Sequence, residues 1–525
     1  MRTLYETLRP KRLFFAGALS FLSVVPAGCS EGAETASREV RLPAVQGQFY
    51  PAEREKLRAA VEGFLEDALA APPERPLGLV APHAGYVFSG QIAADAFARA
   101  RGHDYDLVVI LGTPHTVPRF EGVALIPRGA FRTPLGDAEI DEGAAAELLR
   151  SSAGCLEYRE AHAREHSVEV QVPFVQVLFP RAKILPAIVG SPSPEVGRRF
   201  AEGLARIARD RKALVVASSD LSHYPRYEDA RRADRAVLEA LASMDPERFR
   251  ATVDAEERRG VPGLSTCACG EAPILALLAA AKALGATRAE LVSAANSGDC
   301  LVAGDPDRVV GYGAVAFYAG RPAKAGAEPG ASAGPARAPA PAGAALDAAS
   351  KKALLAFARK TIRRFLETGM TPLPRPEEGP FALRRGAFVT LKKKGELRGC
   401  IGHMAPDTPL IRVVGQMALQ AAFADRRFTP VREEELKEVE LEISVLTPAK
   451  PVAGPAEIVV GRDGVVLAKA GRSAVFLPQV ATEQGWGLEE MLEHLSRKAG
   501  LPPGSWKEGA QFSTFQAEVF KESDF

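Results

Sequence analysis

Between residues 40 and 319 the chain alternates short, uncharged apolar runs with longer amphipathic stretches. Runs rich in β-branched residues are typical of strands that are buried on both faces, as in a parallel sheet. Such strands are predicted at Leu77–Val80, Leu107–Leu111, Val123–Ile126, Lys183–Val189, Leu214–Ala217, Leu291–Ala295 and Val309–Phe317. Helices are predicted between them at Ser89–Ala98, Ser167–Leu178, Pro194–Ala208 and Ala230–Ala242. This alternation predicts a layered α/β domain over residues 40–319.

Several of these strands end in a histidine-containing polar segment. His83 follows the first strand, His115 follows the second, and the strand at Leu214–Ala217 leads to Asp220 and His223. Open α/β sheets place their chemistry at the carboxyl ends of the strands. A single loop histidine is usually solvated, but three histidines at three strand ends favour a common site.

A cysteine completes this candidate site. Cys269 lies in a glycine-bounded loop before an apolar helix that begins near Ile274. Imidazole and thiolate ligands suit iron, copper or zinc, and Asp220 would orient a ligand or act as a base. The spacing matches no short metal-binding signature. Cys267, two residues earlier, is interpreted as a bystander rather than as a ligand.

A second polar pair, Glu165-His166, comes just before the predicted helix at residues 167–178, and Glu169 follows one turn later. This arrangement suits an acid–base pair in an active site. It equally suits a hydrogen-bonded network at the start of a helix. Both interpretations stay open at this point.

A linker separates the first module from a second one. Residues 320–347 are rich in Pro, Ala and Gly and cannot form a core. Residues 348–525 group their strands and helices instead of alternating them, which predicts a smaller α+β domain. Its elements are predicted at Ala353–Thr368 (helix), Ala387–Leu391 and Glu396–Ile401 (hairpin), Ile411–Ala424 (helix), Val439–Val445, Val465–Leu467 and Ala474–Leu477 (strands), Leu488–Ala499 (helix) and Phe512–Phe520 (strand).

The second module contains the motif Leu397-Arg398-Gly399-Cys400-Ile401-Gly402. Glycines on both sides of a thiol indicate a tight backbone arrangement in a small cleft. Cys400 would act as a nucleophile if Arg398 lowered its pKa and His403 served as its base. The preferred interpretation is structural, with Arg398 binding an anion or a neighbouring carboxylate.

Composition narrows the function classes. The chain has 525 residues, a formal net charge of +1, 46% hydrophobic residues and 25% charged residues, which are values of a globular protein of several domains. The balanced charge argues against a nucleic-acid-binding surface. Six cysteines are too few for a disulfide framework in a chain of this length.

The first 29 residues have the pattern of an export signal. A basic start is followed by the apolar segment Leu13–Val25, which is short for a membrane span. The segment Pro26-Ala27-Gly28-Cys29 resembles a bacterial lipobox, except that Pro26 stands where leucine is usual. We therefore expect an envelope protein with a lipid anchor on Cys29, or one cleaved near Ala27 without lipidation. An uncleaved signal would leave the protein in the cytoplasm.

Residues 41–319 resemble the Memo family. The resemblance rests on motifs in the family's order: PAVQGQFYP from Pro43, APHAGYVFSG from Ala81, GTPHT from Gly112, EHSVEVQ from Glu165, SSDLSHY from Ser218 and VGYGAVAFY from Val310. It implies a fold similar to class III extradiol dioxygenases. It also implies an iron(II) or copper site held by His83, His115, His223 and Cys269, with Asp220 beside them and Glu165 and His166 in the pocket. Glu271 follows the cysteine motif where the family usually has a basic residue.

Residues 350–525 resemble the AMMECR family through the Arg398–Gly402 motif, Asp425–Pro430 and Leu477–Ala481. Memo-like and AMMECR-like proteins form the AmmeMemoRadiSam set together with a radical S-adenosylmethionine protein. The resemblance implies a redox-active, oxygenase-like metalloprotein with that radical partner. The alternative is a non-catalytic protein that binds a metal or a peptide, with the AMMECR-like domain as an adaptor.

Overall fold

The computed structural model describes residues 39–525 except residues 118, 153, 192, 321–344 and 376–378. The predicted signal peptide and Cys29 therefore lie outside the described residues. The chain divides into two compact units, one on either side of residues 321–344. Each unit is described by itself below.

The first unit is built on an eight-stranded sheet with the order β10-β11-β2-β9-β3-β8-β4-β7. The four central strands, β2, β9, β3 and β8, run parallel to one another, and antiparallel pairs flank them. The bounds are β2 Pro76–Ala81, β3 Leu107–Gly112, β4 Val123–Leu125, β7 Cys155–Glu157, β8 Lys183–Val189, β9 Ala213–Ser218, β10 Ala286–Asn296 and β11 Gly311–Ala319. Every residue of β3 and β9 is buried, which is expected of central parallel strands.

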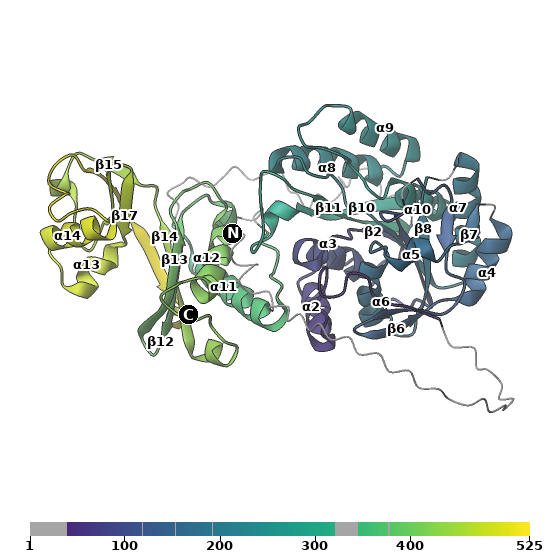
Figure 1. Cartoon of the computed structure of the whole chain (residues 1–525), viewed down its shortest axis with the longest axis horizontal. Coiled ribbons are helices and arrows are strands. Elements are labelled where there is room, and N and C mark those ends of the chain that lie inside the picture. Colours follow the sequence, from purple (N-terminus) through teal and green to yellow (C-terminus); the bar gives the residue numbers. More distant parts are fainter. Residues whose placement is uncertain (1–38, 118, 153, 192, 321–344, 376–378) are drawn as a thin grey trace, which may run out of the picture. The chain divides into compact units, whose positions relative to one another are not determined.

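Helices cover both faces of this sheet (Figure 1). One face carries α4 (Glu142–Ser151), α7 (Pro194–Arg209), α8 (Tyr227–Ala242), α9 (Pro246–Glu257) and α10 (Glu271–Ala283) around one apolar core. The other face carries α2 (Arg54–Glu66), α3 (Tyr86–Ala98) and α6 (Val172–Leu178). The layered α/β fold predicted for this module is confirmed.

A small separate sheet and a 3₁₀ turn accompany the main sheet. The strands β1 (Val40–Arg41), β5 (Ala130–Thr133) and β6 (Gly136–Glu139) form a small separate sheet. The helix predicted to begin at Ser167 is replaced at its start by the 3₁₀ turn η1 (Glu169–Gln171), which leads into α6. The segment that carries Glu165 and His166 therefore stays outside the regular helix, after the short α5 (Glu160–Ala163).

The second unit is α+β. Its first sheet has the order β13-β12-β14-β19, and α11 (Ala348–Thr368) and α12 (Leu410–Phe423) contribute to the apolar core on one face. Its second sheet, β15-β18-β16-β17, shares an apolar core with α13 (Pro478–Gln484) and α14 (Leu488–Lys498). The bounds are β12 Ala387–Lys393, β13 Glu396–His403, β14 Val439–Leu446, β15 Lys450–Val452, β16 Gly464–Lys469, β17 Arg472–Phe476, β18 Gln511–Phe515 and β19 Ala517–Lys521.

The single closing strand predicted at Phe512–Phe520 is wrong. The chain instead forms β18 in one sheet and β19 in the other. The crossing point is Gln516, whose backbone N–H donates to Thr447 Oγ1 at 2.8 Å while its carbonyl accepts from Thr447 N–H at 2.8 Å. Among the residues that the structure describes, no helix is long and apolar enough to cross a membrane.

Candidate metal site

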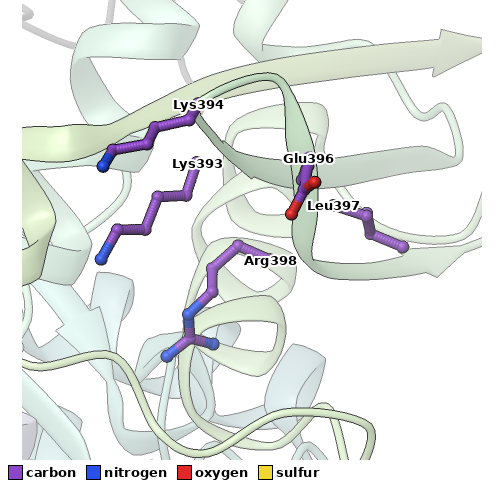
Figure 2. A pocket seen from close by; sticks show the side chains of 5 residues that line it. All are labelled: Lys393, Lys394, Glu396, Leu397 and Arg398. Atoms are coloured by element: carbon purple, nitrogen blue, oxygen red, sulfur yellow. The ribbon is translucent and has the colours of Figure 1, made fainter.

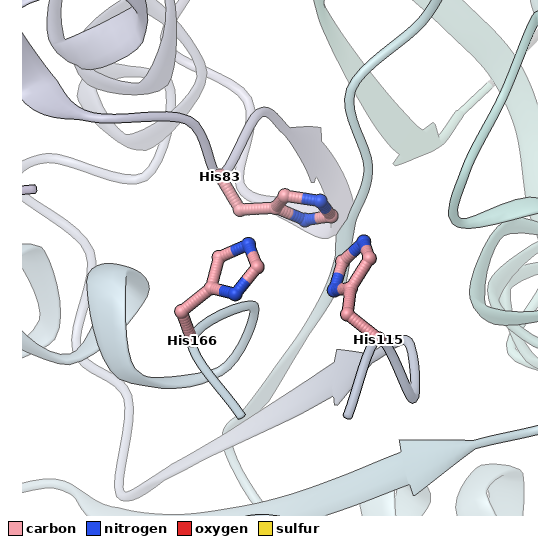
Figure 3. A group of neighbouring side chains, drawn as sticks. All are labelled: His83, His115 and His166. Carbon is pink, nitrogen blue, oxygen red and sulfur yellow. The ribbon is translucent and has the colours of Figure 1, made fainter. Parts of the chain in front are cut away.

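Three histidine side chains from separate segments meet at the carboxyl ends of β2 and β3 (Figure 3). One ring nitrogen of each of His83, His115 and His166 lies within 4.8 Å of those of the other two. The rings of His115 and His166 stack with centroids 4.6 Å apart, and His83 meets both of them edge-on at 5.1 and 5.4 Å. This convergence fits the strand-end prediction, and it adds His166 to the group.

The hydrogen bonds around His83 fix its tautomer. Ser218 Oγ donates its one proton to the Ser167 carbonyl at 2.6 Å and accepts from Gln171 Nε2 at 2.8 Å. Its contact of 3.1 Å with His83 Nδ1 therefore has the imidazole N–H as the donor. This arrangement leaves Nε2 of neutral His83 with a free lone pair, 3.2 Å from Cys269 Sγ. Burial, followed by the charges of His115, His166 and His223, lowers the pKa of His83 well below its usual range.

Glu165 plays the same orienting role for His115. The carboxylate accepts from His115 Nδ1 at 2.9 Å and from the His115 backbone N–H at 2.7 Å. It also accepts from the backbone N–H groups of His166 and Ser167. Burial alone would raise the pKa of Glu165, but the hydrogen bond and charge of His115, with further contributions from His166 and Ser167, lower it to about 2. An ionised Glu165 accepts from Nδ1–H of His115, which makes Nε2 the nitrogen available to a metal.

His223 shows the same pattern on the loop after β9. Its Nδ1 lies 2.8 Å from the Leu221 carbonyl, which accepts only, so Nδ1 is again the donor and Nε2 is free. The backbone of His223 is held by an N–H bond to the Thr266 carbonyl at 2.9 Å. His223 acts on the pKa of His83 and so lies in its electrostatic neighbourhood, but it is not part of the close three-histidine group.

Cys269 and Asp220 lie on the opposite side of His83 from Ser218. Asp220 Oδ1 accepts from the backbone N–H groups of His83 at 2.7 Å and Ala84 at 3.3 Å, which fixes the turn that carries His83. Burial raises the pKa of Asp220 to about 6 and raises the pKa of the Cys269 thiol above its usual range. The Cys269 thiol is then the donor to the free Nε2 of His83. Cys267 is fully buried within the apolar core.

His166 differs from the other three histidines. Its Nδ1 is 3.5 Å from Glu165 Oε1, beyond a good hydrogen bond, and Phe49 packs edge-on against its ring at 4.9 Å. Burial lowers the pKa of His166 to about 4, with the charge of Glu165 opposing this shift. His166 is therefore a neutral imidazole at neutral pH, without the tight Nδ1 acceptor that orients the others.

The sequence did not reveal which hydrogen bonds hold this site together. Ser218 and Gln171 fix His83, although Ser218 stood in the motif that had been singled out. Glu169 is fully buried and binds Arg41, the backbone N–H groups of Ala44 and Val45, and the Tyr50 hydroxyl. Glu169 thus fastens residues 41–50 beside the segment with His166. The signal available in the sequence was the spacing Glu165-x-x-x-Glu169, which showed that both belong to one network but not their separate roles.

The donor set fits a transition metal. His83, His115 and His223 each donate Nδ1–H to a protein acceptor, as metal-binding histidines usually do with the ring nitrogen that does not hold the metal. Imidazole nitrogens with a thiol are ligands for iron(II), copper or zinc and not for magnesium or calcium.

Comparison with known proteins identifies the family of the first unit. The family model described as Memo-like protein matches residues 41–316, which is more than half of the chain. The chain belongs to the Memo-like family. MEMO1 family proteins of Methanopyrus kandleri (38% identical over 293 residues) and Nitrosopumilus maritimus (35% over 284 residues) each align with 53% of this chain and 99% of their own length. The AMMECR1 family model matches residues 355–520, so this Memo-like chain also carries an AMMECR1 domain.

One solved structure is also similar, an uncharacterized protein from Pyrococcus horikoshii. It is 38% identical and covers 33% of this chain and 90% of its own, with a TM-score of 0.32.

The predicted AMMECR motif residues lie on β13, but they do not form the catalytic group that the sequence allowed. Arg398 forms ion pairs with Glu435 at 2.8 and 3.0 Å, and it lines a shallow surface depression with Lys393, Lys394, Glu396 and Leu397 (Figure 2). His403 Nε2 lies 2.7 Å from Asp407. Gly399 faces α12, where an added Cβ would lie 2.3 Å from the Ala421 carbonyl, and Gly402 lies under the Phe388 ring. Arg398 thus has the carboxylate partner of the preferred structural interpretation.

Proposed function

We propose that the Memo-like unit binds one iron(II) or copper ion through Nε2 of His83, His115 and His223 and through Sγ of Cys269. The observation that supports this ligand set is the common tautomer: each of the three histidines donates Nδ1–H to a fixed acceptor, which leaves Nε2 for a metal. His166 lies closer to His83 and His115 than His223 does, but it lacks such an acceptor. We therefore place His166 beside the metal and not among its ligands.

The remaining polar residues would hold and move protons. Asp220, whose pKa burial raises to about 6, lies with Oδ2 4.0 Å from His83 Nε2 and would exchange a proton near neutral pH. Glu165 keeps its charge, orients His115 and would stabilise positive charge on His166. Binding of a cation would also favour release of the Cys269 proton.

A bound iron or copper ion would supply one-electron redox chemistry, and the function we propose is that of a redox-active, oxygenase-like protein of the AmmeMemoRadiSam system. The fusion of a Memo-like unit with an AMMECR1 domain on one chain supports this assignment. A radical S-adenosylmethionine protein is the proposed partner, and no nucleic acid is involved. The proposed location is the cell envelope, on the membrane surface if Cys29 is lipidated. A radical enzyme is expected in the cytoplasm, so partner and location need separate tests.

A second candidate function is metal or peptide binding without catalysis, with the AMMECR1 domain as an adaptor. It is favoured by the size of the donor set, because three imidazoles and a thiol leave fewer open positions than the two histidines and one carboxylate of a non-haem oxygenase site.

Redox cycling of the metal-loaded protein distinguishes the two functions. The protein is purified without air, loaded with iron(II) or copper, exposed to oxygen and then re-reduced while the metal spectrum and dissolved oxygen are followed. Reversible oxidation with oxygen consumption supports the redox function. A bound metal that neither changes oxidation state nor consumes oxygen with catechols or reductants contradicts it and supports the binding function.

A further inference from the structure

Tyr224, the residue after His223, has an unusual backbone conformation. Its φ of 73° lies in the left-handed region that residues with a side chain rarely adopt, yet the residue stays 41% exposed. The Tyr224 N–H donates to the Val309 carbonyl at 2.6 Å, and the Val309 N–H donates to the Pro225 carbonyl at 2.9 Å. Gly263 also comes so close that a Cβ there would lie 2.5 Å from the Tyr224 carbonyl oxygen. These contacts hold an exposed ring in a strained position that its burial does not offset, which is typical of functional sites.

The Tyr224 ring contacts both His223 and Arg308. It meets the His223 ring edge-on with centroids 5.6 Å apart, and the Arg308 guanidinium carbon lies 4.0 Å from the centre of the Tyr224 ring. The backbone supports the same neighbourhood, because Arg308 comes two residues before Val310, which pairs with His223 in an isolated β-bridge. Arg308 is therefore separated from a proposed metal ligand by a single aromatic ring.

Arg308 is an exposed cation whose neighbouring acids are engaged elsewhere. Asp307 pairs with Arg226 at 2.7 Å, and Asp305 accepts from the Asp307 backbone N–H at 3.0 Å. Within the described part of the chain, no carboxylate forms an ion pair with Arg308. Stacking on the Tyr224 ring orients the planar guanidinium, whose paired N–H groups match the two oxygens of a carboxylate. Arg308 is thus an oriented cation that is available to a ligand.

We propose that Arg308 binds the carboxylate of the substrate of the metal site, and that this site selects small monocarboxylic acids. Tyr224 holds Arg308 one ring width away from His223. The best-matched ligand therefore carries its carboxylate across a single aromatic ring from the group that reaches the metal-binding histidines. This inference rests on the proposed metal site and adds the chemical class of its substrate.

The charges around Arg308 favour a monoanion. Arg308 is one cation, and Asp305 and Asp307 lie beside it in the sequence. A phosphate group carries a charge of about −1.5 to −2 at neutral pH and would be repelled by these acids more strongly than a carboxylate would be. A carboxylate needs only the paired N–H groups of one guanidinium.

The test compares binding of para-hydroxybenzoate with binding of its neutral amide, para-hydroxybenzamide. The full chain is loaded with iron(II) without air, and calorimetric titration gives the Kd of each compound and the ratio of the two. The wild-type chain should prefer the acid, and Arg308→Gln should reduce this preference about three- to tenfold, through loss of one charge-assisted pair near the surface.

Arg288→Gln is the matched control. The Arg288 guanidinium carbon also lies over a tyrosine ring, 4.1 Å from the centre of Tyr318, but at the end of β11 that is remote from Val310. A fall in preference confined to Arg308→Gln supports the inference. An unchanged preference in Arg308→Gln, an equal fall in both variants, or no binding of either compound overturns it.

Two further measurements separate this inference from the proposed metal site. Chelator competition on the wild-type chain shows whether metal is bound, and the titrations are repeated on the metal-free chain. Absence of metal binding, with a preference for the acid that still depends on Arg308, contradicts the proposed metal site and supports acid binding by Arg308. Metal binding without that preference overturns the role of Arg308 and leaves the metal site standing.

Discussion

Ser218→Ala removes the hydroxyl that fixes the tautomer of His83 and leaves every proposed metal ligand unchanged. The wild-type hydroxyl accepts from His83 Nδ1 at 3.1 Å and from Gln171 Nε2 at 2.8 Å, and it donates to the Ser167 carbonyl at 2.6 Å. Alanine leaves these buried groups without that partner. His83 can then carry its proton on either nitrogen, so Nε2 is no longer reserved for a metal.

Ser218→Ala should weaken metal binding and should also lower folding stability, and the two effects can be measured separately. Removing the hydrogen-bond partner of a metal-binding histidine typically weakens metal binding about 10- to 100-fold, which corresponds to about 1.4–2.8 kcal/mol. Leaving buried polar groups unpaired costs about 1–3 kcal/mol of folding stability. Metal affinity is measured by competition with a chelator of known affinity, and stability is measured by thermal unfolding of the metal-free protein.

Ser152→Ala is the control for the stability effect. Ser152 is also buried in the first unit, and its hydroxyl donates to the Arg199 carbonyl at 3.3 Å, away from the histidines. We expect Ser152→Ala to lower stability but to leave metal affinity unchanged. Metal affinities of the two variants that agree within about twofold, well short of the 10- to 100-fold loss, would refute the reasoning about the tautomer.

Three further predictions concern other parts of the chain. Glu169→Gln breaks the buried ion pair between Glu169, which is 1% exposed, and Arg41, which is 7% exposed. The substitution should lower the free energy of unfolding, measured by calorimetry, by about 3–5 kcal/mol. A loss smaller than that of Ser152→Ala would contradict the stabilising role of this pair. The hydrogen bond and charge of Arg398 hold the pKa of Glu435 at about 2 against burial, so the stabilisation by its carboxylate is complete above the ordinary value of 4.5 and is lost as the pH falls toward 2. Both tryptophans, Trp486 and Trp506, lie in the second unit, so their fluorescence should follow this acid transition, and Arg398→Gln should shift it to higher pH; an unchanged midpoint would count against the pair. Mass spectrometry of the mature N-terminus should show a lipidated Cys29, and an intact Met1 would end the export proposal.

The sequence was most informative where chemistry follows from strand order. The apolar runs before His83, His115 and Asp220 are central parallel strands, and the carboxyl ends of neighbouring parallel strands necessarily lie side by side. Cys269 was predicted to belong to the site because it is a thiol in a loop before a buried helix. The hydrogen bond to Ser218 and the position of His166 depend on the irregular segment before α6. Periodicity carries no information about such a segment.

The second unit shows a different limit. Arg398 lies two residues before Cys400 in the sequence, and a nearby cation made it a reasonable partner for the thiol. The register between β12 and β13 passes from Leu391↔Gly399 to Lys392↔Leu397, so Arg398 is the extra residue of a β-bulge and is directed to Glu435 instead. Likewise, no glycine or proline interrupts the segment from Phe512 to Phe520, although the chain changes sheets at Gln516.

The ligand set is the central claim, and metal content measured without air tests it most directly. We expect about one iron or copper ion per wild-type chain and a large loss in His83→Ala, Cys269→Ala and His223→Ala, with retention in His166→Ala. Unchanged metal content in both His83→Ala and Cys269→Ala would contradict the site, and loss in His166→Ala with retention in His223→Ala would replace His223 by His166 as the third imidazole.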